Sequence, residues 1–182
     1  MKIITLVCPI LLAFAVNAHA QSEDAARAEL QQAATGESFR IGYSQFRLIP
    51  TSVVAEAKAS SKSAASGKVR VGPYTVGAQT AKAATGAKAA AAKPKLMAAM
   101  SDDGRAVVVT STLEVYHRNV SALKDAAKAT GGKLTYSSEA GGNGRIEFAS
   151  VAEAMAAMPK ILGISGIKDV APEIIQGEDR QM

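Results

Sequence analysis

RAVVVTSTLEVYHR, residues 105–118, is the stretch from which the fold of this chain can be argued. It is rich in β-branched residues, which predicts a long or bent strand. Asn119 follows as the expected N-cap of a helix over VSALKDAAKAT. The pair Gly131 and Gly132 is expected to end that helix, because glycine readily adopts the backbone conformation of a helix C-terminus.

The sequence downstream of this helix predicts a hairpin, a second helix and a last strand. Residues 133–150, KLTYSSEAGGNGRIEFAS, place a glycine-rich turn between two alternating segments. Ser150 and Glu153 form a capping box that opens the second helix, and Pro159 is expected to bend or end its first turns. The apolar segment 167–170 follows as a strand. This order predicts an α+β, ferredoxin-like βαββαβ domain, an antiparallel sheet with two helices on one face.

The first twenty residues are typical of an export signal rather than of a folded domain. They contain a basic start, an apolar run and the small-residue site Ala18-His19-Ala20. We expect cleavage after Ala20 and a periplasmic or secreted mature protein. The apolar run is shorter than the roughly 20 residues that a spanning helix needs, so the mature chain is expected to have no transmembrane span.

The region between the signal and the domain changes composition once. Residues 21–57 predict a helix, opened by Ser22, followed by a half-buried strand in SFRIGYSQFRLIP. Residues 58–100 hold eight basic residues and no acidic residue among Ala, Ser, Gly and Thr. This composition predicts a mobile, low-complexity basic linker, with one short hairpin in VRVGPYTVG. The ordered domain is expected over 101–176 and a polar tail over 177–182.

Composition excludes most familiar catalytic sites. The expected cleavage removes Cys8, the only cysteine, and leaves His117 as the only histidine. Disulfides, thiolate zinc sites and Cys–His nucleophiles are therefore excluded, and a Ser-His-Asp triad would have to use His117. We predict a protein that is not an enzyme and holds no metal or cofactor, with His117 at the surface or partly buried. Nucleic-acid binding is disfavoured, because the basic segment lacks interleaved aromatic residues and Phe148 is interpreted as core.

Three local motifs resemble the propeptide-type inhibitors of subtilisin-like serine proteases, the peptidase inhibitor I9 family. They are ATGGKLTY at 129–136, FASVAEAM at 148–155 and GIKDVAPEI at 166–174. The resemblance covers roughly residues 105–176. This chain has Ala171 where family members often carry an acidic residue before the proline.

The resemblance implies a subtilisin-like serine protease as the partner, bound in trans. It also implies that the open sheet face packs on the protease and that the segment after the last strand lies in the substrate cleft by strand addition. The implied protease-binding residues are Asp169, Pro172, Glu173, Ile174, Ile175, Gln176 and Gly177. Two alternatives stay open: Ile174 and Ile175 either anchor this peptide or extend the last strand, and the protein is either an inhibitor or a folding helper, a chaperone.

A second function class follows from the basic linker. In this reading the chain is an envelope-associated structural or adaptor module. The linker makes a weak contact with an anionic envelope surface, and the sheet face binds an unrelated partner.

Overall fold

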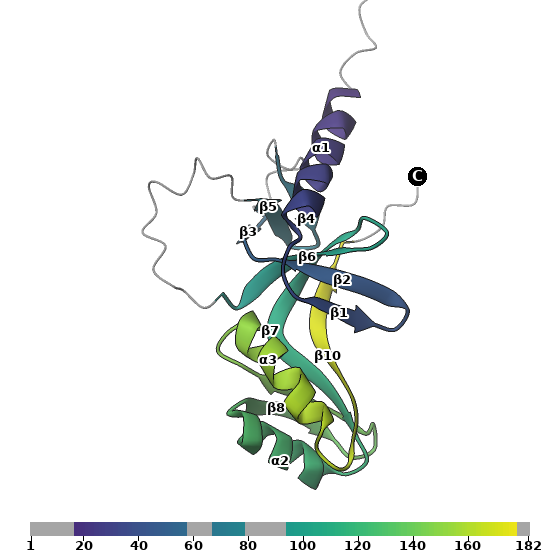
Figure 1. Ribbon diagram of the computed structural model, residues 1–182, viewed down its shortest axis with the longest axis vertical. Coiled ribbons are helices and arrows are strands. Elements are labelled where there is room, and N and C mark those ends of the chain that lie inside the picture. The colour runs from purple at the N-terminus through teal and green to yellow at the C-terminus, as the bar shows by residue number, and fades with distance from the viewer. Residues whose placement is uncertain (1–16, 58–66, 79–93, 178–182) are drawn as a thin grey trace, which may run out of the picture.

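The computed structural model describes residues 17–57, 67–78 and 94–177 (Figure 1). Within these ranges the chain is an α+β protein with three helices and antiparallel sheets. One sheet has the strand order β1-β2-β6-β7-β9-β8, with β10 also paired to β7, and a smaller sheet has the order β3-β5-β4. The smaller sheet and α1 lie at one end of the molecule, and α2 and α3 lie at the other (Figure 1).

The central strand is β7, Ala106–His117. Along one edge it pairs with β10, Ile167–Gln176. Its other edge is shared: β6, Leu96–Ser101, pairs with residues 106–110, and β9, Asn143–Glu147, pairs with residues 112–116. The predicted long strand is therefore confirmed, and it joins the two ends of the molecule.

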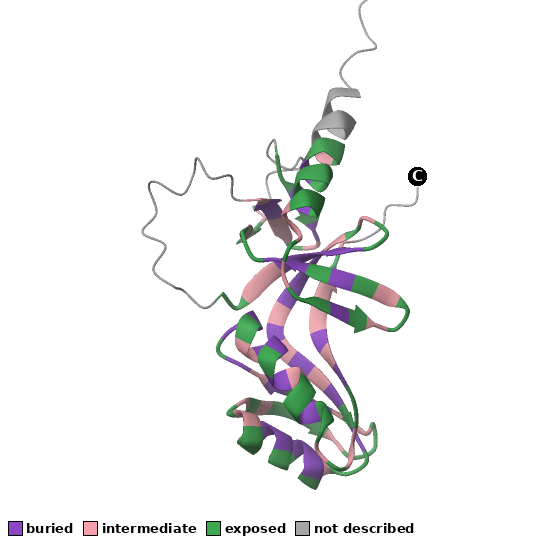
Figure 2. Cartoon of the chain, in the orientation of Figure 1, coloured by how far each residue is buried: buried purple, intermediate pink, exposed green. Residues whose placement is uncertain are grey.

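The burial of β7 changes along its length (Figure 2). Val107, Val108 and Val109 are all buried, so both faces of the sheet are covered at the start of the strand. After Ser111 only alternate residues are buried, among them Leu113 and Val115. One face of the second half is consequently left open, as expected for an antiparallel sheet with a single covered face.

Two apolar clusters cover the first half of β7. Val108 faces a cluster that includes Leu30 of α1, Asn17–Ala33, together with residues of the small sheet. That sheet consists of β3, Ser52–Glu56, β4, Val69–Val71, and β5, Tyr74–Ala78. Val107 and Val109 face the opposite cluster, in which the rings of Phe39 and Phe46 stack with their centroids 5.3 Å apart.

The single strand expected in SFRIGYSQFRLIP is wrong: this segment is a hairpin. Its strands are β1, Ser38–Ile41, and β2, Ser44–Ile49, paired in antiparallel register. Gly42 has φ +59° at the turn, as the first central position of a type II′ turn requires. Tyr43, the second residue of this turn, is fully exposed.

The structure also differs from two expected boundaries, those of the linker over residues 58–100 and of the N-terminal helix. The short hairpin expected in VRVGPYTVG is present as β4 and β5, but β6 lies inside the range 58–100 and pairs with β2 and β7. The sheet thus crosses the boundary expected at residue 101. Residues 58–66 and 79–93 of the expected linker lie outside the described residues. Helix α1 begins at Asn17 rather than after Ser22, because no Gly or Pro interrupts its backbone.

The lower end of the molecule follows the predicted order of elements. Helix α2, Val120–Thr130, is capped by Asn119, whose Oδ1 accepts from the backbone N of Ala122 at 2.8 Å. Strand β8, Lys133–Ser138, pairs with β9. Helix α3, Val151–Leu162, starts at the expected Ser150 cap and continues through Pro159, so the expected break there is wrong.

One core joins these elements. It is formed by buried residues of both helices and of β7, β9 and β10: Leu113, Val115, Leu123, Ala126, Ala127, Ile146, Phe148, Ala154, Ala157, Ile161 and Val170. Phe148 is thus a core residue, as predicted. Both helices pack on the same apolar cluster, which leaves the opposite face of the strands open.

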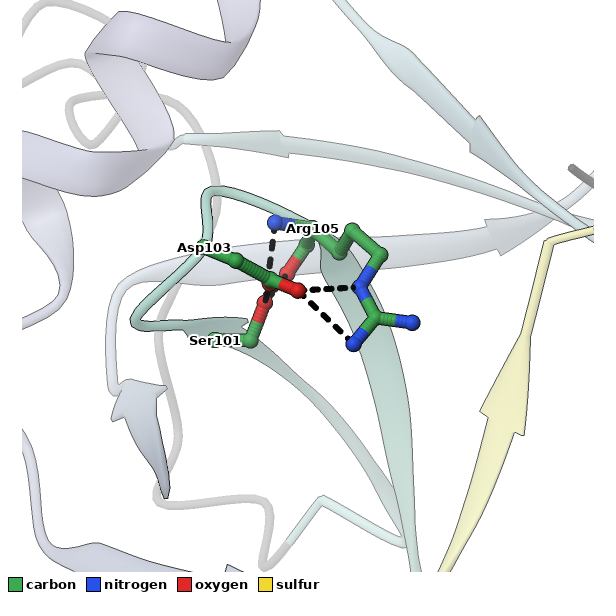
Figure 3. Close-up of polar contacts among 3 residues, drawn as sticks. All are labelled: Ser101, Asp103 and Arg105. Carbon is green, nitrogen blue, oxygen red and sulfur yellow. Dashed lines mark hydrogen bonds and ion pairs between the residues drawn. The ribbon is translucent and has the colours of Figure 1, made fainter. Parts of the chain in front are cut away.

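A tight turn sets the start of β7 (Figure 3). The hydroxyl of Ser101 donates to the carboxylate of Asp103 and accepts from the backbone N of Arg105 at 2.9 Å. The same carboxylate binds the guanidinium of Arg105 at 2.8 Å. The Ser101 hydrogen bond is the largest of the causes that lower the pKa of Asp103. Asp102 and Asp103 lie in this turn, which Gly104 completes at φ +84°.

Close packing of β9 against α2 predicts a large effect of one methyl group. A Cβ at Gly144 would collide with the Leu123 side chain and lie 2.8 Å from the carbonyl oxygen of Tyr136. We expect Gly144→Ala to lower the free energy of unfolding by about 1–3 kcal/mol, measured by urea denaturation, since overpacking shifts the backbone. Gly163→Ala is the control: its nearest atom is 3.5 Å away. Equal effects of the two substitutions would contradict this packing.

Candidate functional site

The candidate site is the open face of the strands β10, β7, β9 and β8, on the side away from α2 and α3. Side chains alternate along each strand, so residues between the buried positions of β7 point to this face. Tyr116 is 40 % exposed there and Tyr136 of β8 is 50 % exposed. Glu114 of β7, two residues before Tyr116, is half-buried. The face is polar and charged, with two tyrosine rings.

Cross-strand register arranges these side chains in rows. Asp169 of β10 pairs with Tyr116 of β7, which pairs with Asn143 of β9. In the next row Ala171 pairs with Glu114. That row continues from Glu114 to Arg145 and from Arg145 to Tyr136. Residues directly opposite each other in antiparallel strands have adjacent side chains on one face. Three strands therefore bring carboxylates, a tyrosine and an arginine together.

Hydrogen bonds and an ion pair hold this face in place. The carboxylate of Glu173 lies 3.7 Å from Nη1 of Arg145 and accepts from the hydroxyl of Thr110 at 3.1 Å. The carboxylate of Glu114 accepts from the amide of Asn143 at 3.4 Å. Asp169 accepts from the backbone N of Val170 at 2.8 Å. Glu173 and Glu114 are thus held by contacts to neighbouring strands, whereas the contact of Asp169 lies within β10.

Tyr116 stays protonated to an unusually high pH. Burial is the largest cause that raises the pKa of Tyr116 above its ordinary value, and the negative charges of Glu114 and Asp169 raise it further. The hydroxyl also donates a hydrogen bond to Glu114, which favours the protonated form. The row therefore offers a neutral phenol between two carboxylates, suited to hydrogen bonding rather than to nucleophilic attack.

A groove of about 520 Å³ lies over part of this face. One wall is formed by the rows on β7, β9 and β10, including Tyr116 and Arg145. The other wall is the tip of the β1–β2 hairpin, at Arg40, Ile41 and Gly42. The groove can bind a chain segment or a cationic group through its carboxylates. Its described lining carries three carboxylates, those of Glu114, Asp169 and Glu173, beside two arginines and one tyrosine.

The structure places the expected protease-binding residues in a strand. Glu173, Ile174, Ile175 and Gln176 belong to β10, and the last three pair with Val109, Val108 and Val107. Ile174 and Ile175 each pack against an apolar cluster at the upper end of the molecule. The expected free peptide at these positions is wrong, because main-chain pairing and apolar burial hold them in the sheet. The alternative, extension of the last strand, is what the structure shows.

The remaining expected residues divide between the face and the strand end. Asp169 is exposed on the open face and lines the groove. Pro172 is buried and pairs with Leu113, just before a register shift that leaves Glu173 without a Cα partner in the ladder. Gly177 follows the strand and lies against β4. Four of the expected residues therefore line the groove, Asp169, Pro172, Glu173 and Ile174, whereas Ile175, Gln176 and Gly177 do not.

Four polar side chains of the groove were missed by sequence reasoning: Arg40, Glu114, Tyr116 and Arg145. The pattern Leu113-Glu-Val-Tyr-His117 alternates apolar and polar side chains and could have indicated Glu114 and Tyr116. Nothing in the local sequence indicates Arg40, because only the tertiary fold brings the β1–β2 hairpin to this face.

The expectation that His117 is at the surface or partly buried is wrong, because the side chain is fully buried. Its side chain is 1 % exposed, and among the described residues neither ring nitrogen has a hydrogen-bond partner.

In the described ranges no group of three or more His, Cys, Asp or Glu side chains could hold a metal ion. No helix among residues 17–57, 67–78 and 94–177 is long and apolar enough to cross a membrane.

The row through Tyr116 predicts a titration effect. We expect Glu114→Gln to lower the pKa of Tyr116, because the substitution removes a negative charge that raises it. The pKa should stay above the ordinary value, since burial and Asp169 remain. Ring resonances of labelled tyrosine, followed by NMR against pH, measure this shift. Glu139→Gln, an exposed acid in the β8–β9 turn, is the control. An unchanged pKa of Tyr116 in Glu114→Gln would show that these groups are not neighbours.

Comparison with models of known protein families, with curated proteins and with solved structures finds no significant match to this chain. The function must therefore be inferred from the residues of the chain itself.

Proposed function

We propose that this chain is an exported, non-enzymatic binding protein that docks on its partner through the open face of the sheet. The observation that carries the proposal is the row of Asp169, Tyr116 and Asn143, beside that of Ala171, Glu114 and Arg145. Cross-strand contacts hold Glu114, Asn143 and Arg145 before any partner binds. A preorganised surface loses less conformational entropy on binding than a mobile one.

We further propose that residues 106–176 form a ferredoxin-like unit of the propeptide type. The chain order β7-α2-β8-β9-α3-β10 and the neighbours β10-β7-β9-β8, all antiparallel, support this. The shared apolar cluster of α2 and α3 supports the placement of both helices on one face. The larger sheet adds β6, β2 and β1 to the first half of β7, outside this unit.

The partner that we propose is a subtilisin-like serine protease, which the chain inhibits or helps to fold in trans. The carboxylates of Asp169 and Glu114 would meet positive helix N-termini on the protease surface. Each such contact contributes roughly 0.3–1 kcal/mol at an exposed site. Ala171 stands where members of the propeptide family often carry an acidic residue. Asp169 supplies the negative charge instead, because Asp169 lies on the same face and is exposed.

This docking mode differs from insertion of the peptide 173–177 into a substrate cleft. Glu173 to Gln176 are committed to β10, and releasing them would break their pairing with β7. Further strand addition at the outer edge of β10 is also disfavoured, because Pro172 and the irregularity after it interrupt that edge. The side-chain face is the better binding surface.

Introducing a positive charge in the centre of the face tests the proposal. Ala171→Arg would place a bulky cation between Asp169 and Glu114, and we expect it to weaken binding to a subtilisin-like protease by more than about tenfold. Asp169→Asn should weaken binding about two- to fivefold, since it removes one helix-terminus contact. The measurements are inhibition constants over a panel of subtilisin-like enzymes. Lys124→Arg, a conservative change on the exposed side of α2, is the control.

Two outcomes would contradict the proposal. One is that no enzyme of the panel is bound or inhibited by the wild-type chain. The other is that Ala171→Arg inhibits as well as the wild type. Salt-sensitive binding to anionic vesicles, unchanged in Ala171→Arg, would instead support the envelope adaptor.

A further inference from the structure

The groove over the open face has apolar as well as charged walls. The apolar residues that line it are Ile41 at the tip of the β1–β2 hairpin and Ala171, Pro172 and Ile174 of β10. Its volume of about 520 Å³ lies within the range of about 300–1,000 Å³ that is usual for clefts that bind small ligands. A group with an aliphatic part can therefore bury that part between the hairpin and β10.

The charges of the lining do not balance. Its three carboxylates exceed its two arginines by one negative charge. One arginine, Arg145, lies 3.7 Å from the carboxylate of Glu173. Glu114 and Asp169 form no ion pair with any residue that the structure describes, and they accept hydrogen bonds from uncharged groups only. The groove thus holds two carboxylates that have no cationic partner within the described part of the chain.

These two carboxylates lie on either side of a tyrosine ring. Asp169 pairs directly with Tyr116, and Glu114 precedes Tyr116 by two residues on the same face of β7. Asp169 and Glu114 are therefore diagonal neighbours, at the separation of about 7–8 Å that long side chains can bridge. After burial, the charges of Glu114 and Asp169 are the main causes that raise the pKa of Tyr116, so the potential at the ring is negative.

We propose that this groove binds an arginine side chain that the partner presents. The inference rests on the proposed function, because it takes the open face as the docking surface, and it names one group that the partner must supply. A guanidinium group is planar, stacks on aromatic rings and has five N–H donors, so one group can lie on Tyr116 and donate to both Glu114 and Asp169. The methylene groups of the arginine would lie against the apolar walls. Its single positive charge neutralises the groove.

Short peptides test this specificity on the full chain. The probe is acetyl-Gly-Arg-Gly-amide, and the matched control contains citrulline, which has the same shape without the charge. We expect the arginine peptide to bind at least about fivefold more tightly than the citrulline peptide, and more tightly than the lysine peptide. Titrations followed by NMR on the ring resonances of Tyr116 measure this. Equal or tighter binding of the citrulline or the lysine peptide overturns the proposal.

Removal of the two unpaired carboxylates should weaken binding. We expect Glu114→Gln/Asp169→Asn to lower the affinity for the arginine peptide by about three- to tenfold, the order of two exposed ion pairs, and to leave the affinity for the citrulline peptide unchanged. The control Asp125→Asn/Glu139→Gln removes two exposed acids outside the groove lining and should bind as the wild type does. Equal losses of affinity in the two double variants would contradict the site.

A gain of affinity gives a test that misfolding cannot mimic. Arg40 lines the opposite wall of the groove and carries the same charge as the expected ligand. We expect Arg40→Gln to strengthen binding of the arginine peptide by about two- to threefold. Arg47→Gln is the control, because Arg47 is exposed on the same hairpin but does not line the groove. Weaker or unchanged binding in Arg40→Gln would contradict the site.

The outcomes separate this inference from the proposed function. Binding of the arginine peptide by a chain that binds no subtilisin-like protease would support the arginine site and contradict the protease as the partner. Binding of a protease by a chain that does not bind the arginine peptide would support docking through the open face and overturn the arginine site.

Discussion

The pairing of β7 with three other strands is the constraint on which the rest of the structure depends. β10 runs along one edge of β7, whereas β6 and β9 share the other edge in succession. The change of partner occurs at Ser111, whose carbonyl accepts from the backbone N of Phe148 at 2.9 Å, just beyond β9. Across β7 from this point, β10 has its register shift between Pro172 and Ile174. The partner change of β7 at Ser111 and the register shift of β10 between Pro172 and Ile174 therefore lie opposite each other. The two parts of the sheet meet at this position.

This junction decides which surfaces are covered. Above it, Val108 contacts the cluster of α1 and the small sheet, and Val107 and Val109 contact that of β1 and β2. Below it, α2 and α3 cover one face and the other face keeps its charged and tyrosine side chains. The β1–β2 hairpin ends near this lower face, so the groove lies at the boundary between doubly and singly covered sheet.

The open face combines rigidity with charge. Glu114 and Glu173 are each held by a hydrogen bond from a neighbouring residue, and Asp169 stays exposed. Burial and two carboxylates keep the Tyr116 hydroxyl protonated, so it acts as a hydrogen-bond donor. Such an arrangement suits recognition of a surface with positive partial charges.

Sequence reasoning succeeded where local chemistry decides the structure. The caps Asn119 and Ser150 begin their helices as predicted, because each side chain satisfies a free backbone N–H group. It failed for β6, whose segment LMAAM is rich in alanine and poor in β-branched residues. There the small side chains are buried on both faces between β2 and β7, and tertiary pairing overrides the weak strand propensity. Pro159 likewise lies inside α3, whose packing on the core outweighs the lost hydrogen bond.

In the candidate site, too, some residues could be predicted from the sequence and others are decided by tertiary pairing. Asp169 and Glu173 were predicted from the resemblance, but their neighbours Glu114, Tyr116 and Arg145 come from strands whose register local sequence does not specify. By itself the sequence determined the α+β class, the order of elements after residue 105 and the absence of a disulfide framework, since caps, turns and composition act locally. Only the tertiary structure decided that Ile174 to Gln176 are held in a strand and that a distant hairpin forms one wall of the groove. Both depend on pairing and burial between residues far apart in the chain.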